Sequence, residues 1–528
     1  MQIINKLNTN FFLVLLVFLF GLLFNQYFGN RGVFPIDSFL HFDTGYRTAL
    51  GEFPFKDYWT VSGPFIDLLQ SIIFKIFGAN WQAYVLHGSI INALFSTLSL
   101  IVFINLGLKR NVSLFYSICI SILAYPVSAT PFVDLHSTYL SIIAIYFIIF
   151  AVTTKKKIYW FFIPIWFFFA FLSKQVPAGY FFIFVIIGLI YFFIAKGIKK
   201  NLNILVILFI STFLCFLLLF IILDIKEIIF KDFLIQYFIY PSEIAQRRLS
   251  NFEYNFKNLF LDFKLIYIIF IFYLILFFYK FFILKDVKKN NLFYTYLITI
   301  CIFLPLIHHQ IITKNQVFIF FLIPFYCALV HLEVDKSIKK NKNLILNLII
   351  IFCILSTIKY HYRFNLERKF HELNRVNFTS SINASLIDEK FRGLSWITPN
   401  NINNESVLRE INNINKILTI LKKDNSIKMV ITNYSFFSIL LNNTQNGINR
   451  AYPGDNSVFP EKNSSYFLFY KNYFFRHLVK KNIKNIYVIY DVSEENLTNY
   501  IDEKCLKLDD SNPYFKKFNF NVNCNYKN

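Results

Sequence analysis

The stretch FFLVLLVFLFGLLFNQYF, residues 11–28, decides what kind of protein this chain can be, because it contains no charged residue. A helix of about 20 apolar residues is long enough to cross the hydrocarbon core of a bilayer. Lys6 ahead of this stretch would also suit a signal peptide. However, no small-x-small cleavage site follows, and the apolar stretch is long for a signal peptide. We therefore expect an uncleaved first membrane helix.

The rest of the chain has a similar composition. Of its 528 residues, 56% are hydrophobic, 20% are aromatic and only 16% are charged. A soluble fold cannot bury so much apolar surface. Hydropathy over a window of about 19 residues predicts about eleven membrane helices, near residues 11–28, 82–106, 112–127, 136–154, 158–172, 176–195, 202–223, 264–284, 292–309, 316–333 and 343–359. The fold class is therefore an all-α polytopic membrane protein, with a multi-pass domain over residues 1–359.

The basic residues indicate which side of the membrane each loop faces. If the N-terminus is cytoplasmic, the inside loops hold sixteen Lys and Arg residues and the short outside loops hold only Lys174 and Lys314. Loops rich in Lys and Arg stay on the cytoplasmic side. Much of the net charge of +22 is therefore a topological signal, and nucleic acid is not expected as a partner. The sequence predicts a cytoplasmic N-terminus and an extracytoplasmic tail, residues 360–528.

The pattern of this tail is typical of a small α/β domain. Apolar residues at helical spacing run from Val407 to Leu421, and residues 428–434 and 485–491 have the pattern of buried strands. No Gly-rich nucleotide-binding turn occurs, so no cofactor is assigned. Cys505 and Cys524 could form a disulfide outside the cytoplasm, worth about 3 kcal/mol. The other five cysteines lie in predicted spans.

Acidic residues gather in the first outside loop, residues 29–81. Five of them lie between Asp37 and Asp67. Acidic residues contribute little to topology, so their crowding favours a chemical role, with a solvated loop surface as the alternative. Residues 64–78, PFIDLLQSIIFKIFG, have a broad apolar face and are predicted to lie along the membrane surface. The long outside loop 224–263 carries a second apolar face, from Phe230 to Phe238, and is also predicted to form an interfacial helix.

The first loop has a recognisable order of acidic, glycine and proline residues. Asp37 follows the first span, Gly51 comes fourteen residues later, and then Pro54, an aromatic residue, Asp57 and Pro64 lead into the apolar segment. This order resembles the C-type (GT-C) membrane glycosyltransferases, in particular the branch that contains the protein O-mannosyltransferases and the lipid A aminoarabinose transferase. The resemblance covers roughly residues 30–110. Asp37-Ser38 stands where the family often has Asp-Glu, which weakens a metal site, and Gly63-Pro64 stands where it often has Pro-Pro.

The resemblance implies a transferase that takes a sugar from a polyprenyl-phosphate carrier on the outer side of the membrane. Whether a divalent metal takes part is left open. An acceptor hydroxyl is a poor nucleophile at neutral pH, so it needs a base, and a nearby carboxylate can take its proton. Asp37 is the first choice, because it occupies the family's acidic position. The alternative is an acid at a helix start, beside Pro35 and Ser38.

Two other acids are candidate catalytic residues. Asp43 is a rival base, but Arg47 lies four residues further on and would pair with it on a helix. Asp134 lies in the second outside loop, where C-type enzymes often place another acid. An N-terminal helix cap is an equally good interpretation of Asp134.

The leaving phosphate needs cations to stabilise its charge. Lys174 is the best candidate, because it stands alone between two apolar spans, with snorkelling to lipid phosphates as the alternative. Arg247 and Arg248 could clamp a phosphate, although adjacent arginines in a loop are more often a solvated surface. His308 and His309 diverge by about 100° on a helix, so a shared metal is not expected and one of them could bond to phosphate. The other phosphate-binding candidate is Lys314.

Three functions are compatible with these features. The first is a bacterial inner-membrane glycosyltransferase, with Asp37 as base in a single displacement, whose partners are a polyprenyl-phosphate-sugar donor, membrane lipids and an envelope lipid, glycan or protein acceptor. The second is a transporter or flippase of lipid-linked sugars, but internal repeats and mid-span charges are not visible. The third is a non-catalytic scaffold whose tail recruits a partner.

Overall fold

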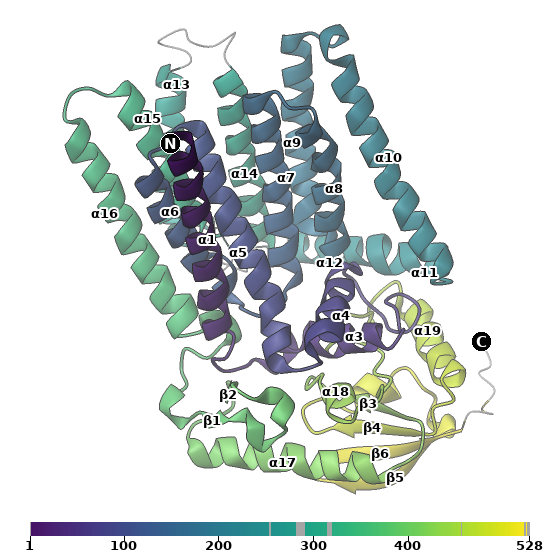
Figure 1. The fold of residues 1–528 in the computed structure, drawn as a ribbon. Coiled ribbons are helices and arrows are strands. Elements are labelled where there is room, and N and C mark those ends of the chain that lie inside the picture. Colours follow the sequence, from purple (N-terminus) through teal and green to yellow (C-terminus); the bar gives the residue numbers. More distant parts are fainter. Residues whose placement is uncertain are drawn as a thin grey trace. The chain divides into compact units, whose positions relative to one another are not determined.

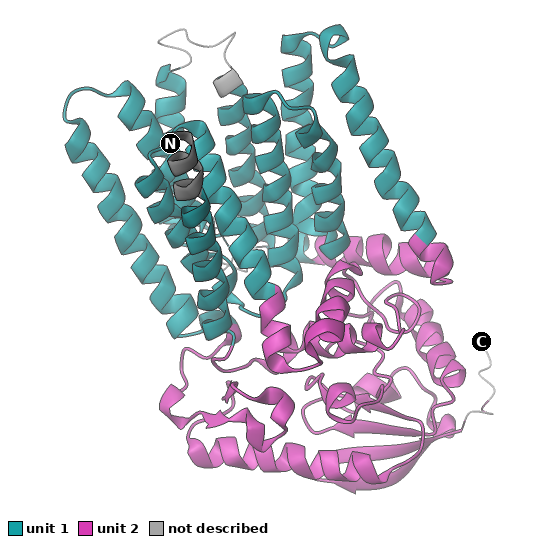
Figure 2. Cartoon of the chain, in the orientation of Figure 1, with its two compact units in different colours: residues 1–29, 88–221, 248–370 teal, residues 30–87, 222–247, 371–528 magenta. Residues whose placement is uncertain are grey.

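The computed structural model describes residues 2–252, 255–280, 291–313, 319–455, 457–521 and 524. The chain forms two compact units, coloured separately in Figure 2. Unit 1 comprises residues 1–29, 88–221 and 248–370, and unit 2 comprises residues 30–87, 222–247 and 371–528. Segments of the predicted multi-pass domain are thus grouped with the tail in unit 2.

Unit 1 is built from long apolar helices (Figure 1). Among the described residues, eight helices are long and apolar enough to cross a membrane, and α8 and α13 are shorter apolar helices. Each of the eleven predicted spans overlaps one helix of the chain, which confirms the polytopic all-α prediction. These helices are α1 (Gln2–Phe28), α5 (Trp81–Leu106), α6 (Arg110–Leu123), α7 (Val133–Thr154), α8 (Ile158–Ser173), α9 (Gln175–Lys196), α10 (Leu202–Ile225), α13 (Lys264–Phe278), α14 (Asn291–Thr313), α15 (Leu322–Ser337) and α16 (Lys342–His361).

The helices of unit 1 differ sharply in how much of their surface they bury. α7 packs against α8, α9 and α14, and 94% of its most apolar window is buried, whereas only 11% is buried in the α10 segment Lys199–Ile225. Small polar residues let α7 pack closely, and Ser141 meets its own hydrogen-bonding need by donating to the carbonyl of Ser137 at 2.7 Å. α10, with a mean hydropathy of 3.2, has the surface expected of a helix in contact with lipid.

Unit 2 contains an α/β layer built by the tail. The sheet has the order β3-β4-β6-β5, in which β3 and β4 are parallel and the other pairs are antiparallel. A two-stranded antiparallel ladder joins β1 and β2. The strands are β1 (Ile382–Asn383), β2 (Ser395–Trp396), β3 (Lys428–Ile431), β4 (Asn485–Ile489), β5 (Leu506–Asn512) and β6 (Phe515–Phe520). The α/β pattern of the tail is confirmed, because both predicted strands pair in this sheet.

The helices of the tail include α17 (Asn404–Lys423), α18 (Phe437–Leu440), α19 (Phe467–Lys480) and α20 (Glu495–Thr498). Asn403 and Ser406 form a capping box that begins α17, since each side chain accepts a hydrogen bond from the other's backbone N–H. Its apolar residues, spaced three or four apart from Val407 to Leu421, are buried.

The first loop forms α2 (Pro35–Ser38), α3 (Leu40–Ala49) and α4 (Phe65–Phe77). It shares a core with the tail, because Phe39 contacts the rings of both Trp396 and Phe436. α4 exposes Ile72 and Phe77 but buries Asp67 completely. The polar residue that interrupts its apolar pattern therefore faces the interior.

The long loop forms α11 (Phe230–Leu234), a π-turn at Ile235–Ile239 and α12 (Tyr240–Ser250). The helix continues through Pro241, which has no N–H to donate. The π-turn ends at Ile239, two residues before the proline. The prediction of a helix here is confirmed, whereas the prediction that Arg247 and Arg248 lie in a loop is wrong.

Candidate functional site

Asp37 lies in the first turn of α2, two residues after Pro35, which begins the helix. Asp37 is partly exposed, and its carboxylate lies close enough to Tyr84 to act on it electrostatically. The hydroxyl of Ser38 accepts a hydrogen bond from the N–H of Phe34 at 2.9 Å, so Ser38 closes the helix start. The local sequence thus explains the position of Asp37, and its side chain keeps an exposed edge.

Asp43 has the ionic partner that the sequence suggested. On α3, its carboxylate lies 3.7 Å from the guanidinium of Arg47, one turn further on. Burial raises the pKa of Asp43, whereas Arg47 and a hydrogen bond with Ser438 oppose that rise. Arg47 also donates to Glu52 at 2.6 Å and to the carbonyl of Gly447 at 2.6 Å. Asp43 is therefore part of a buried charge network that joins the first loop to the tail.

Asp67 is the centre of this network, although the sequence pattern predicted no role for it. It accepts hydrogen bonds from His41 Nδ1 at 2.7 Å, Thr44 Oγ1 at 2.8 Å and Tyr58 OH at 2.7 Å, and it pairs with Arg450. Burial alone would raise the pKa of Asp67, but Arg450 and His41 hold it below its usual value. Asp67 is therefore an ionised, fully buried carboxylate with four donors.

The His41–Asp67 pair has the connectivity of a catalytic dyad, since one ring nitrogen is fixed by a carboxylate. Burial lowers the pKa of His41, although Asp67 opposes this, and Nε2 has no hydrogen-bond partner among the described residues. However, His41 is completely buried. No acceptor can reach this nitrogen, so the pair supports the structure of the loop.

A second polar cluster lies in unit 1, where three candidates from distant segments meet. Asp134, in the first turn of α7, accepts hydrogen bonds from Lys174 Nζ at 2.8 and 3.0 Å and from His309 Nε2 at 2.8 Å. Lys174 lies between α8 and α9, and His309 lies on α14. We call these three residues the Asp134 cluster. The side chain of Asp134 therefore pairs with Lys174 and His309 and does not cap the backbone at the start of α7.

The Asp134 cluster has a cationic, partly open side. The Lys174 side chain is 23% exposed, whereas those of Asp134 and His309 are 8% and 4% exposed. Arg248, also in unit 1, lies close enough to His309 to act on it electrostatically. Lys174 is a permanent cation beside Asp134, and the positive charge of Arg248 acts on His309. This side of the cluster is therefore suited to a phosphate.

The other candidate cations are placed differently. Arg247 lies in unit 2 and pairs with Glu243, one turn before it, at 3.6 Å. His308 packs edge-on against the ring of Tyr180, 4.7 Å between centroids. Lys314 lies outside the described residues.

A divalent metal finds no ready set of ligands in the described part of the chain. No group of three or more His, Cys, Asp or Glu side chains there is arranged to hold one. In the Asp134 cluster, Lys174 occupies the position beside the carboxylate that a cation would take. These residues therefore do not fit a metal, and no step is assigned to one.

The helical bundle, the first-loop helices and the α/β tail make up a fold that has a counterpart among solved structures. Across 98% of both chains, the protein is similar to the crystal structure of ArnT from Cupriavidus metallidurans bound to undecaprenyl phosphate, with a TM-score of 0.50 and 11% sequence identity. The apo form of the same protein matches over 98% of both chains at a TM-score of 0.40 and 12% identity. No family model and no curated protein matches the sequence. The C-type fold that the first loop suggested is thereby confirmed.

Proposed function

We propose that the protein is a membrane glycosyltransferase that moves a sugar from a polyprenyl-phosphate carrier to an envelope acceptor on the extracytoplasmic face. The observation that carries this proposal is the C-type fold over 98% of the chain, shared with a protein crystallised with undecaprenyl phosphate. The apolar helices of unit 1 supply the bilayer setting that such a lipid requires. We further propose a bacterial inner membrane, with the N-terminus in the cytoplasm.

The Asp134 cluster supports a role in binding the carrier's phosphate. Lys174 makes two contacts to Asp134, but an ammonium group has three N–H donors, and its partial exposure leaves room for another acceptor. Charge-assisted hydrogen bonds of this kind stabilise the phosphate as it leaves. Arg248 adds a second positive charge at His309. Asp134 would hold Lys174 and His309 in place.

Asp37 is our candidate for the general base. The acceptor oxygen forms a bond to the anomeric carbon while the bond from that carbon to the phosphate oxygen breaks. The acceptor's proton passes to the Asp37 carboxylate, and the carrier leaves as polyprenyl phosphate. Asp43 and Asp134 are poorer candidates because both are buried, so an acceptor hydroxyl reaches them less easily. Asp37 is partly exposed, as proton transfer from a substrate requires.

The test is sugar transfer by the purified full-length protein, supplied with a panel of radiolabelled polyprenyl-phosphate sugars and a membrane lipid extract. We expect label in lipid, glycan or protein with the wild type. Asp37→Asn should reduce transfer by about 10²- to 10⁴-fold, the usual contribution of a general base. Asp510→Asn, at an exposed position on β5, is the matched control and should transfer normally. Full activity of Asp37→Asn would remove this residue from the mechanism, and no transfer from any donor by folded protein would contradict the proposed activity.

A further inference from the structure

A polar cleft of about 410 Å³ opens in the tail and shares no residue with the groups described above. One wall is formed by Gly454 and by residues 461–463, and the other carries lining residues between Ser493 and Tyr500, a stretch that includes α20. Its volume is within the range of small-molecule sites, about 300 to 1,000 Å³. It is therefore large enough to hold a ligand.

The lining of the cleft is dominated by uncharged polar groups. Asn463, Asn496, Asn499 and Ser493 line it. The Asn496 amide already donates to the carbonyl of Ser493 at 3.1 Å, and the Ser493 hydroxyl accepts from the N–H of Glu495 at 3.3 Å. Each side-chain amide has an NH₂ donor and a carbonyl acceptor. It can therefore donate a hydrogen bond to a sugar hydroxyl or accept one from it. Asn499 makes no side-chain hydrogen bond to another residue that the structure describes. Its amide is available to a ligand.

The charges of the cleft argue against a phosphate. Two carboxylates, Glu461 and Glu495, and a single cation, Lys462, line it. With a net charge of −1 from these three groups, the cleft repels anions. A nucleotide or a phospholipid head group is thus disfavoured, whereas a neutral polyol meets acceptors and donors on both walls.

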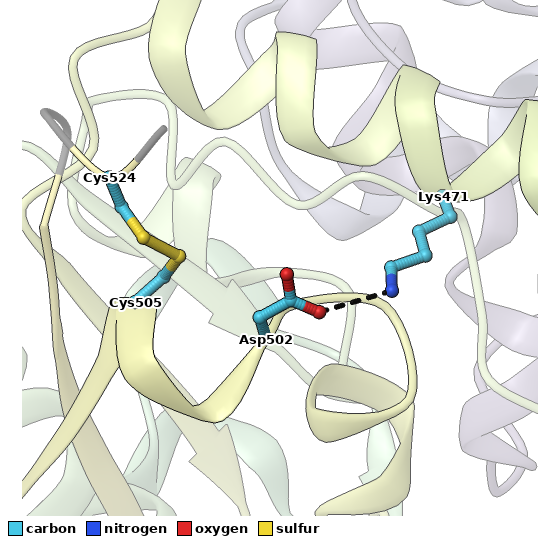
Figure 3. Close-up of a disulfide and its surroundings, with 4 residues drawn as sticks. All are labelled: Lys471, Asp502, Cys505 and Cys524. Carbon is cyan, nitrogen blue, oxygen red and sulfur yellow. Dashed lines mark hydrogen bonds and ion pairs between the residues drawn. A yellow bond between two sulfur atoms is a disulfide. The ribbon is translucent and has the colours of Figure 1, made fainter. Parts of the chain in front are cut away.

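The two walls are fixed before any ligand binds. The hydroxyl of Tyr500 donates to the carbonyl of Pro460 at 3.0 Å and so links them. The chain that follows α20 is held by the Lys471–Asp502 ion pair at 3.3 Å and by the Cys505–Cys524 disulfide, both drawn in Figure 3. A preformed cleft loses little conformational entropy when a ligand binds. This raises the affinity for hydroxyl-rich ligands, whose individual hydrogen bonds are weak.

We propose that this cleft binds a neutral saccharide and, given the proposed transferase function on which this step rests, that it holds the glycan part of the acceptor. The amides of Asn463 and Asn499 hydrogen-bond the sugar hydroxyls from opposite walls. Among lipid, glycan and protein acceptors, the cleft therefore selects acceptors that carry a neutral glycan.

Binding is measured without donor, so that this proposal can fail or succeed independently of transfer. The full-length protein in detergent is titrated by calorimetry with neutral oligosaccharides of two to four residues, built from glucose, galactose, mannose, rhamnose or N-acetylglucosamine. Sialyllactose and inorganic phosphate serve as anionic probes. We expect at least one neutral oligosaccharide to bind and neither anion to compete with it.

Two variants locate the binding. The double variant Asn463→Ala/Asn499→Ala should bind the neutral saccharide with an affinity about tenfold lower than the wild type, since two hydrogen bonds are lost. Asn412→Ala, at an exposed position of α17, is the matched control and should bind like the wild type. Unfolding midpoints of all variants show that they are folded. The proposal is overturned if no neutral saccharide binds, if only an anionic probe binds, or if the folded double variant binds as tightly as the wild type.

Discussion

Replacing Lys174 by methionine, alone and together with Asp134→Asn, would separate a structural role of Lys174 from a role in binding phosphate. Removing one partner of a buried ion pair costs about 3 to 5 kcal/mol. Lys174 is partly exposed, and His309 still donates to Asp134 at 2.8 Å. We therefore expect Lys174→Met to lower the free energy of unfolding by only about 2 kcal/mol.

The double variant should regain most of this stability, because the Asp134→Asn change replaces the carboxylate by a neutral amide and leaves no unpaired charge. Transfer should not return with it. One charge-assisted hydrogen bond to the phosphate is worth about 1.5 to 3 kcal/mol, which corresponds to a loss of about 10- to 150-fold in kcat/KM. The single and the double variant should share this loss.

The assays are thermal unfolding in detergent and initial rates of transfer with the radiolabelled donor. Lys156→Met, in an exposed loop, is the matched control for the loss of a lysine. If the double variant transfers sugar at the wild-type rate, Lys174 serves only to neutralise Asp134, and the phosphate-binding role is refuted. An unchanged unfolding midpoint in Lys174→Met would show that the ion pair between Lys174 and Asp134 does not stabilise the fold.

Three further outcomes follow from the structure of unit 2. Since Arg450 and His41 hold the pKa of Asp67 below its ordinary value, the stability that Asp67 contributes is present above pH about 4 and is lost as the pH falls further. The difference in unfolding midpoint between wild type and Asp67→Asn should therefore shrink from pH 7 to pH 3, and a constant difference would contradict this. Arg450→Met should cost about 3 to 5 kcal/mol in denaturant unfolding, because it leaves Asp67 without its guanidinium. Cys505 and Cys524 are separated by 19 residues, so the free energy of unfolding of the Cys505→Ser variant should be about 3 kcal/mol lower than that of the wild type. A reducing agent should lower the free energy of unfolding of the wild type by the same amount and leave that of the variant unchanged.

The membrane helices could be predicted because hydrophobicity acts locally. Each run of about 20 apolar residues is sufficient to define a span, whatever lies elsewhere in the chain. The tail's β3 and β4 were predictable for the same reason, since their apolar residues are consecutive. Helix ends are harder to predict: the sequence favours a loop for Arg247 and Arg248, but α12 runs from Tyr240 to Ser250 and includes both.

The polar sites were predictable only in part. The sequence points separately to Asp134, Lys174 and His309, because each is a polar residue next to apolar spans. It does not predict that they meet, as they do in the structure. Asp67 was overlooked because its main cation, Arg450, lies 383 residues away. One signal was present, namely a carboxylate on the apolar face of a predicted helix, which must find partners if it is buried.

The core shared by the first loop and the tail has a consequence for biosynthesis. Arg47 reaches the carbonyl of Gly447, which is 400 residues later in the chain. At about 5 to 20 residues per second, ribosomes need about 20 to 80 s to make that interval. During this time the loop carries unpaired acids and uncovered aromatic rings. A nascent chain of this kind needs protection at the membrane surface, and a truncation of the tail would leave it in that state permanently.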